Sequence, residues 1–503
     1  MIRRRYLTNV FSNWVQMACA IGWGIVMMPV YLGYLGKADY GIWVLIHALV
    51  GYYGLLDLGV HNAVIRHVAR YLGSGDSKSL NQVFNTALVI QGLAGLLALA
   101  VCVFVASILP RVEGFAAAQH PGIGTLLLLV GVRSALEFPG SVFRGALVAA
   151  ERFELANAVR IVSLSLINSA HIVVLYRGGG LVELAWVLLI ATVIVKPVTA
   201  VLALRTVPGL RLAPRSFRRS RVREVLGYGL HAFVSNAGER LRFFTDALVI
   251  GTFLPAQAIT DFRVGSRPLQ FLTNFVRGIS RVLTPAFSRT ESAGEVDAIG
   301  RLLLFGTRAT ALLASLGCLV LAVAGERLID LWLGPGFDLS IRILLVLMPA
   351  YLLETSLAPT GSALLGTRHF RVLSRATIAE GLANLILSLV LIRPFGLIGV
   401  ALGTTIPMVV TRLFVLPWFA CRGAGLNYTR LMRETWAPVA LPLVGTALLS
   451  ALLVRWLPGR DWLSVAALVV VVTASYAGLA IVSLRARRDP LLPARLQVRR
   501  SDR

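Results

Sequence analysis

Residues 83–109, VFNTALVIQGLAGLLALAVCVFVASIL, contain no charged side chain. An α-helix rises about 1.5 Å per residue, so roughly 20 apolar residues are enough to cross a hydrocarbon layer about 30 Å thick. In lipid, a helix satisfies its own backbone hydrogen bonds, which an isolated strand does not. This stretch therefore predicts a helix that crosses a membrane.

The whole chain shares the character of this stretch. Of its 503 residues, 57% are hydrophobic and only 15% are charged, and the mean hydropathy is +0.76. A soluble domain of this length has no core large enough to hide so much apolar surface. The sequence predicts an all-α polytopic membrane protein with about 14 transmembrane helices. The apolar runs lie near 11–33, 40–64, 83–109, 122–146, 158–176, 181–204, 226–253, 262–287, 301–324, 340–365, 374–392, 396–420, 434–456 and 462–484.

Positive charge is distributed unevenly along the chain. The net charge is +25, and the basic residues gather at the N-terminus, after even-numbered runs and in the C-terminal tail. Lys and Arg near helix ends are retained on the cytoplasmic side of a membrane. The pattern predicts that both termini are cytoplasmic. It also favours contact of the basic loops with membrane lipids over binding of nucleic acid.

Residue types that carry enzyme chemistry are scattered. Cys19, Cys102, Cys318 and Cys421 lie in apolar runs at wide spacing, which fits neither a disulfide framework nor a zinc site. The seven histidines form no metal-binding motif. The outward connections between runs are short, whereas membrane polymerases and glycosyltransferases generally need a sizeable outer loop. These features favour a transporter without a cofactor over an enzyme.

The two halves of the chain share a weak repeat. Ser12-Asn13 precedes LGKADYG at 35–41, and Ser235-Asn236 precedes LPAQAITDF at 254–262. Many transporters are built from repeated helix bundles. We therefore expect two six-helix pseudo-symmetric bundles followed by two further helices. The expected parts are an N-terminal lobe at 1–204, a basic cytoplasmic linker at 205–225, a C-terminal lobe at 226–421, and two additional helices with a basic tail at 422–503.

Several charged side chains fall inside the apolar runs. Each costs about 2.5 to 3.5 kcal/mol in a membrane, so it normally faces a partner or a watery cavity. Residues three or four apart on a helix share a face. On this basis we expect rows made by Tyr53, Asp57 and His61; by Arg133 and Glu137; by Glu239, Arg242 and Asp246; by Arg263 and Arg267; and a lone carboxylate, Glu354, between two prolines.

Four of these sets have two interpretations that the residues alone leave open. The row of Glu239, Arg242 and Asp246 forms either a polar lining with an intramembrane ion network or an ion-paired packing face. Asp57 is either a cation or proton site or a residue that caps or bends its helix beside Gly59 and pairs with a neighbouring helix. Arg133 and Glu137 form either part of a cavity or an internal salt bridge. Glu354 is either a gating or ion-coupling residue or one element of a proline kink.

Motifs near the N-terminus resemble those of a known family. They are Asn13, Pro29-Val30-Tyr31-Leu32, Leu35-Gly36, Tyr40-Gly41-Ile42-Trp43, Leu55-Leu56-Asp57-Leu58-Gly59-Val60, Arg66 and Ala69-Arg70-Tyr71. They are similar to those of the Wzx-type oligosaccharide flippases of polysaccharide biosynthesis, in the MOP/MATE-like superfamily that also holds multidrug exporters and the lipid II flippase. The motifs are most specific in the N-terminal stretch, and the helix layout matches along the whole chain.

The resemblance implies a flippase rather than an enzyme. The implied cargo is an undecaprenyl-pyrophosphate-linked oligosaccharide repeat unit, moved from the inner to the outer leaflet of the bacterial plasma (inner) membrane by alternating access. It serves O-antigen, capsule or exopolysaccharide assembly, alongside a polysaccharide polymerase and chain-length machinery. Coupling to H⁺ or Na⁺, the membrane potential and facilitated exchange all remain open as driving forces. The alternatives are a multidrug or small-molecule exporter of the same superfamily, and a membrane polysaccharide polymerase or ligase.

A cavity for such a cargo needs cations for the diphosphate and hydrogen-bonding groups for the glycan. The bias towards arginine inside and beside the runs favours an anionic cargo over a cationic drug. The expected cavity residues are Asn13, Asp57, His61, Arg133, Glu137, Asn236, Glu239, Arg242, Asp246, Arg263, Arg267 and Glu354.

Overall fold

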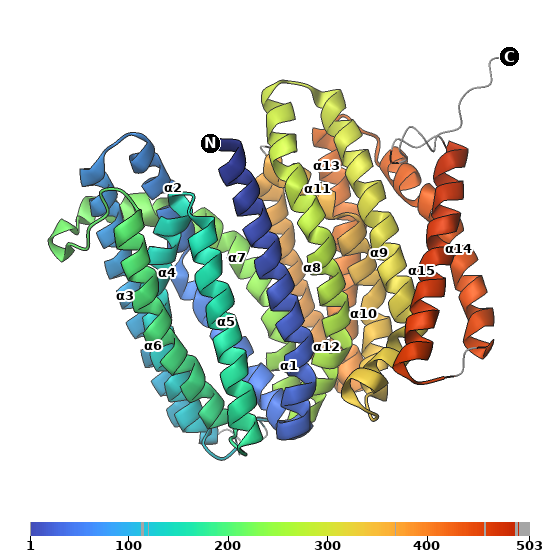
Figure 1. Cartoon of the computed structure of the whole chain (residues 1–503), viewed down its shortest axis with the longest axis horizontal. Helices are drawn as coiled ribbons and strands as arrows, with labels where there is room; N and C mark the ends of the chain where they lie inside the picture. The colour runs from blue at the N-terminus through green and yellow to red at the C-terminus, as the bar shows by residue number, and fades with distance from the viewer. Residues whose placement is uncertain are drawn as a thin grey trace. The chain divides into compact units, whose positions relative to one another are not determined.

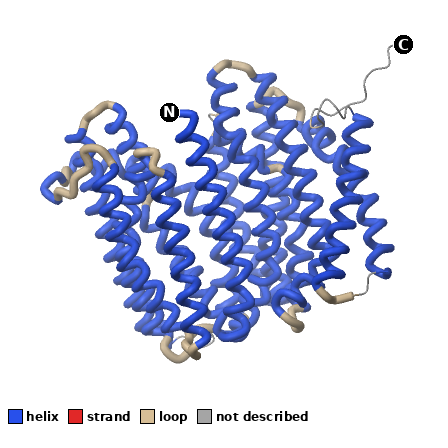
Figure 2. The backbone as a smooth tube through the Cα atoms, viewed as in Figure 1, coloured by secondary structure: helices blue, strands red, loops and turns tan. Residues whose placement is uncertain are grey.

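The protein is helical throughout the part that the structure describes. The computed structural model describes residues 2–111, 115–118, 120–367, 369–456, 459–487 and 491, and these contain helices, turns and loops but no strand (Figure 2). Within these residues, ten helices are long and apolar enough to cross a membrane. The predicted all-α polytopic fold is confirmed, and the chain is a multi-pass membrane protein.

Contacts divide the chain into two compact units, Met1–Thr260 and Asp261–Arg503. The first unit therefore extends past the predicted linker at 205–225, and the four-part division made from the sequence stays a prediction. The helices of the first unit are α1 (Ile2–Tyr53), η1 (Gly54–Asp57), α2 (Val60–Gly73), α3 (Ser77–Ile108), η2 (Leu109–Arg111), α4 (Ile123–Ala149), α5 (Phe153–Tyr176), α6 (Leu181–Thr206), η3 (Pro214–Ser216), α7 (Arg219–Phe253) and the first residues of α8 (Figure 1).

The second unit begins inside α8 (Ala256–Ser292). Both prolines of α8, Pro268 and Pro285, lie inside the helix, where a missing N–H and a ring clash favour bending. The remaining helices are α9 (Val296–Leu333), α10 (Asp338–Ser356), α11 (Ala358–Gly366), α12 (Phe370–Val410), the π-helix η4 (Thr411–Val415), α13 (Leu416–Gly423), α14 (Tyr428–Trp456) and α15 (Trp462–Arg487).

Two of the long helices each consist of two segments joined at a glycine. A straight helix of the 52 residues of α1 would be about 78 Å long, more than twice the thickness of a hydrocarbon layer. The chain turns at Gly36 (φ 74°, ψ 177°) in α1 and at Gly396 (φ 56°, ψ −135°) in α12. Glycine adopts positive φ without a Cβ clash. Counting these helices as two segments each, and adding the charge-bearing α7 and α8, gives the fourteen predicted segments.

The continuous helix predicted over 40–64 is wrong. Leu58 (φ 49°) and Gly59 (φ 74°) adopt the left-handed conformation, so the chain passes from η1 into the separate helix α2. Residues of this handedness end a right-handed helix. The predicted row of Tyr53, Asp57 and His61 is therefore wrong. The three residues do not lie on one continuous helix, so a spacing of four does not place them on a common face.

Two predicted helices of the second unit are interrupted as well. The run at 340–365 is divided at Leu357, and Pro359 stands at the start of α11, where its missing N–H costs no hydrogen bond. The run at 396–420 contains the π-helical turn Thr411–Val415. Such turns are frequent at functional sites.

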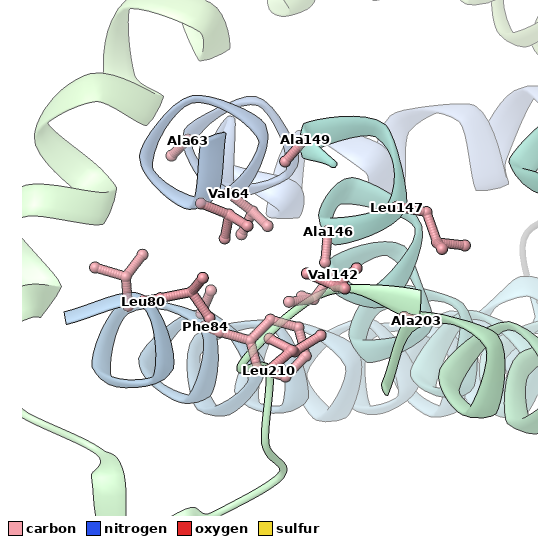
Figure 3. Close-up of a cluster of buried hydrophobic side chains, with 14 of the residues drawn as sticks. Ala63, Val64, Leu80, Phe84, Val142, Ala146, Leu147, Ala149, Ala203 and Leu210 are labelled. Carbon is pink, nitrogen blue, oxygen red and sulfur yellow. The ribbon is translucent and has the colours of Figure 1, made fainter. Parts of the chain in front are cut away.

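The core of the first unit joins helices to the segment that follows α6. Figure 3 shows Val64 of α2, Phe84 of α3, Val142 of α4 and Ala203 of α6 in one cluster with Leu210, which comes after α6. The first four are fully buried, and Leu210 is 5% exposed. Burying an aliphatic side chain of this size contributes about 1.5 to 3 kcal/mol. The start of the segment between α6 and α7 is therefore part of the core.

The two segments of the predicted repeat meet within the first unit. The Thr260 hydroxyl donates a hydrogen bond to the carbonyl of Lys37, at 2.6 Å. A Cβ added to Gly41 would collide with the carbonyl oxygen of Ala256. The start of the second segment of α1 is thus packed directly on the first turns of α8.

Candidate functional site

Helix α4 carries a carboxylate that two cations share. The Lys196 ammonium of α6 lies 2.5 Å from Glu137 Oε1, and Arg133 Nη2 lies 4.0 Å from Glu137 Oε2. The Glu137 side chain is nevertheless 45% exposed. The predicted Arg133–Glu137 pair exists, and its stronger partner comes from another helix.

Local backbone features place Lys196 against α4. A Cβ on Gly140 would lie 2.5 Å from Lys196 Cδ, so the glycine leaves room for the lysine stem. Pro139 in α4 and Pro197 in α6 both lie inside their helices, where proline favours a bend. α4 and α6 approach closely at this level because Gly140 has no side chain.

Two further arginines lie within electrostatic range of Glu137. They are Arg144 of α4 and Arg160 of α5, whose charges also act on each other. Both side chains are exposed. We name Arg133, Arg144, Arg160 and Lys196 the cation cluster of the first unit.

Asp57 and His61 lie beside this cluster although they are on different elements. Gln91 donates a hydrogen bond to the Asp57 carboxylate, and the His61 backbone N–H lies 3.4 Å from Asp57 Oδ1. His61 Nδ1 lies 3.1 Å from the carbonyl of Ser141 on α4. The charge of Arg144 acts on His61. Counting only these described groups, four cations and two carboxylates lie here, which gives them a net charge of +2.

The second unit contains a separate buried ion network. Arg277 of α8 donates a hydrogen bond to Glu354 of α10. Arg412 of η4 lies 3.7 Å from Glu354 (Nε to Oε2) and 3.5 Å from Glu380 of α12 (Nη2 to Oε2). Glu354, Glu380 and Arg412 are only 3%, 2% and 8% exposed. Two carboxylates and two guanidinium groups thus balance each other in a place where an unpaired charge would be very costly.

A row of polar groups continues from this network along α12. Glu380, Asn384 and Ser388 are spaced four apart, and both Asn384 and Ser388 are buried. Asn384 Nδ2 donates to Thr404 Oγ1 at 3.0 Å. In the described part of the chain, Asn384 Oδ1 and the Ser388 hydroxyl have no hydrogen-bond partner. The row provides oxygen atoms in a mostly apolar stretch of α12.

The structure groups no metal ligands in the part of the chain that it describes. Among those residues, no cluster of three or more His, Cys, Asp or Glu side chains is placed to hold a metal ion.

The predicted residues of α1 and α7 are placed in the first unit. Asn13 Oδ1 accepts a hydrogen bond from Asn157 of α5, at 2.8 Å. Arg242 and Asp246 are buried, at 3% and 7% exposed. The side chains of Asn236 and Glu239 lie outside the described residues. Asn13 is thus joined to α5.

Arg263 and Arg267 lie on α8 in the second unit. Arg263 Nη1 donates to Gln270 Oε1 at 3.4 Å. The Arg267 guanidinium lies 4.7 Å from the centre of the Phe271 ring, a cation–π contact. The ring and the amide of their own helix hold these two arginines.

Glu380 and Arg412 were not among the residues predicted from the sequence. Both are charges inside apolar runs, which is the signal that identified Glu354. Neither has a charged neighbour three or four residues away on its own helix. Because their partners come from other helices, spacing along the chain gave no sign of the network.

A multi-pass helical fold with charged groups inside its helical units is typical of membrane transporters. Solved structures of this architecture are similar to the chain. The lipid II flippase MurJ in an inward closed conformation has a TM-score of 0.75 and 13% identity, covering 96% of this chain and all of that one. An inward-facing MATE family multidrug transporter of the MOP superfamily has a TM-score of 0.67 and 15% identity, over 82% of this chain and 95% of the other.

The chain belongs to the polysaccharide biosynthesis protein family, whose model matches residues 7–291. This confirms the resemblance found in the N-terminal motifs. A probable low-salt glycan biosynthesis flippase, Agl15, of Haloferax volcanii is 23% identical over 80% of each chain. A putative O-antigen transporter of Shigella flexneri is 21% identical, over 77% of this chain and 91% of its own length.

Proposed function

We propose that the chain is a flippase for lipid-linked glycans. Its cargo is an undecaprenyl-pyrophosphate-linked oligosaccharide repeat unit, which it moves from the inner to the outer leaflet of the bacterial plasma membrane by alternating access. The product then serves surface polysaccharide assembly by a polymerase and chain-length machinery. Membership of the polysaccharide biosynthesis family and similarity to proteins named as glycan flippase and O-antigen transporter support this proposal.

The cation cluster of the first unit is the observation that carries the proposal. A diphosphate diester holds one ionised oxygen on each phosphorus and thus two negative charges. The cluster and its two neighbouring carboxylates have an excess of two positive charges. Arginine binds phosphate oxygens with two parallel N–H donors, and lysine binds them as a compact charge. This balance suits a diphosphate better than it suits the cationic drugs of a multidrug exporter.

The buried ion network of the second unit is the group that we propose to couple transport to H⁺ or Na⁺. Its charges are balanced, so protonation of one carboxylate or binding of a cation changes which pairs are stable. We also propose that both termini lie in the cytoplasm, which the positive charge of the even-numbered connections supports.

The leaflet in which lipid-linked glycan accumulates tests the proposal. A strain depleted of the protein is complemented with the wild type, and the lipid-linked glycan is extracted after treatment with an impermeant sugar-modifying probe. We expect unmodified glycan to accumulate on depletion and modified glycan to return with the wild type. Arg133→Gln combined with Arg160→Gln should reduce the return by at least about tenfold, since each lost phosphate contact is worth roughly 1.5 to 3 kcal/mol.

Arg371→Gln combined with Arg375→Gln is the matched control. Both arginines are exposed in the second unit, and the control loses the same charge. Glycan that reaches the outer leaflet at the normal rate without the protein, but stays unpolymerised, would refute the flippase and support a polymerase. Equal loss in both double variants would refute the role of the cation cluster, but it would leave the flippase proposal standing.

A further inference from the structure

The segment between α6 and α7 is held along the first turns of α3. Asn81 Nδ2 donates to the carbonyl of Gly209 (2.7 Å), and its Oδ1 accepts from the backbone N–H of Arg211 (2.6 Å). One turn later, Asn85 Nδ2 donates to the carbonyl of Arg211 (3.0 Å), and its Oδ1 accepts from the N–H of Ala213 (2.9 Å). Two side-chain amides thus satisfy the segment's backbone as a neighbouring strand would.

The core fixes the start of this segment. Val207 and Leu210 are 3% and 5% exposed and belong to the hydrophobic cluster of the first unit, in which Figure 3 shows Leu210. Gly209 has φ +72°, and a Cβ there would lie 2.7 Å from the Ser77 hydroxyl. The segment therefore leaves α6 along one defined path.

Arg221 fixes the other end, at the first turn of α7. Its guanidinium donates to Ser79 Oγ (2.8 Å), Tyr71 OH (2.9 Å) and Glu224 Oε2 (2.6 Å). It also lies 5.5 Å from the centre of the Tyr71 ring. Arg221 therefore ties the start of α7 to α2 and α3.

The outer side of the segment combines apolar and cationic side chains. Leu212 is 56% exposed and Phe217 is 37% exposed, so neither belongs to the core. The arginines around them are also exposed. We name the set the linker surface; it comprises Arg211, Leu212, Arg215, Phe217, Arg218 and Arg219.

The depth of the linker surface follows from α3. The residues of α3 up to Thr86 include Lys78, Asn81, Gln82 and Asn85, whereas residues 87–108 contain no charge. Asn81 and Asn85 lie about 6 and 12 Å from the start of α3, at 1.5 Å per residue. The linker surface therefore lies where the helix passes from polar to apolar, which is the level of lipid headgroups.

We propose that the linker surface binds anionic phospholipid headgroups of the bilayer that surrounds the first unit. Its arginines pair with headgroup phosphates, while Leu212 and Phe217 enter the boundary between headgroups and acyl chains. Asn81 and Asn85 order the backbone of the segment before lipid binds, so the segment loses little entropy on binding. The proposal rests on the fold of the first unit and is independent of the transported cargo.

Lipid retention by the purified full-length protein tests this proposal. The protein in detergent is mixed with equal amounts of phosphatidylglycerol and phosphatidylcholine, and the retained lipids are counted by native mass spectrometry. Replacing the four arginines of the linker surface with glutamine should lower the preference for phosphatidylglycerol by about tenfold or more. The control replaces four exposed arginines of the second unit, Arg371, Arg375, Arg422 and Arg433, with glutamine and should keep the preference.

Two further variants test the apolar side chains of the linker surface and the ordering of its backbone. Leu212→Ser with Phe217→Ser keeps every arginine and should weaken retention, and Asn81→Ala with Asn85→Ala should weaken it by releasing the segment. Equal loss in the linker and control variants would overturn the proposal, because any basic surface would then suffice. Retention unchanged in the linker variant would overturn it too.

Depth is measured independently with a fluorophore attached to Leu212→Cys in vesicles. Quenching by phosphatidylglycerol brominated near the headgroup supports the proposal. An unquenched, water-exposed fluorophore would overturn it and assign the surface to a soluble protein instead.

Discussion

At the residue scale, Arg412 connects two carboxylates of the second unit. It faces both Glu354 and Glu380, and all three are buried. Removing one partner of a buried ion pair leaves an uncompensated charge, at a cost of about 3 to 5 kcal/mol. We expect Arg412→Leu to lower the free energy of unfolding by this amount, measured by denaturant titration in detergent.

The same titration on Arg371→Leu, an exposed site, is the control and should show less than about 0.5 kcal/mol of change. Adding Glu380→Gln to Arg412→Leu should recover part of the loss, because the second change removes the unpaired charge. A loss below about 1 kcal/mol for Arg412→Leu would contradict the role of the network.

His67 and Glu224 make the linker end sensitive to acid. His67 Nδ1 lies 3.2 Å from Glu224 Oε1, and burial lowers the pKa of His67 more than the nearby carboxylate raises it. Burial raises the pKa of Glu224, but hydrogen bonds from Tyr71 and Arg221 outweigh it, so that its pKa is lowered. Both groups therefore favour their deprotonated forms in the folded protein.

The sign of the pH dependence follows from these two pKa values. A group whose pKa is lower when folded stabilises the protein above its unfolded pKa and loses this effect as the pH falls. We expect the thermal midpoint to fall in two steps, the first below about pH 6.5 for His67 and the second below about pH 4.5 for Glu224. His67→Gln should remove the upper step and Glu224→Gln the lower one; an upper step that persists in His67→Gln would disprove this assignment.

At the element scale, Gly41 controls how closely the second segment of α1 approaches the first turn of α8. A side chain there would collide with the carbonyl oxygen of Ala256. Gly41→Val should destabilise the protein by about 1 to 3 kcal/mol through overpacking. Gly33→Ala is the matched control, because Gly33 has nothing within 4 Å of an added Cβ. It should be neutral or stabilising by up to about 1 kcal/mol, and equal effects of the two changes in thermal unfolding would count against the packing argument.

The helices could be predicted from the sequence, but several of their ends could not. Apolar runs such as 83–109 correspond directly to helices, because lipid leaves the backbone few alternatives. The break at Leu58 depends on a left-handed residue that is not glycine, and nothing in its side chain announces that conformation.

The contacts of the candidate site were predicted least well. Arg133 and Glu137 share a helix, and their pairing was therefore visible in the spacing. Lys196 reaches Glu137 from a position 59 residues away in the chain, so the contact depends on helix packing and on the gap at Gly140. The predicted row through Asp57 failed because the helix ends there, although packing still brings Asp57 and His61 close to α4.

At the scale of the whole molecule, the placement of loops relative to the membrane can be measured directly. We expect Ser74, between α2 and α3, to be cytoplasmic and Arg177, between α5 and α6, to face outward. Both are exposed. An impermeant maleimide added to intact cells should label Arg177→Cys and spare Ser74→Cys until the cells are opened. The parent protein, with its four native cysteines, sets the background, and the opposite labelling would invert the predicted topology.

The π-helical turn at Thr411–Val415 changes the rotational phase of everything that follows it. It carries one residue more than an α-turn, and each residue of a helix advances the side chains by about 100°. Deleting one residue there would restore a regular helix and turn Leu416, Ala420 and Cys421 by that angle, away from the buried cluster that they form. The packing of the residues after the π-helical turn thus depends on this extra residue. Removing it would break their contacts although none of these residues is itself changed.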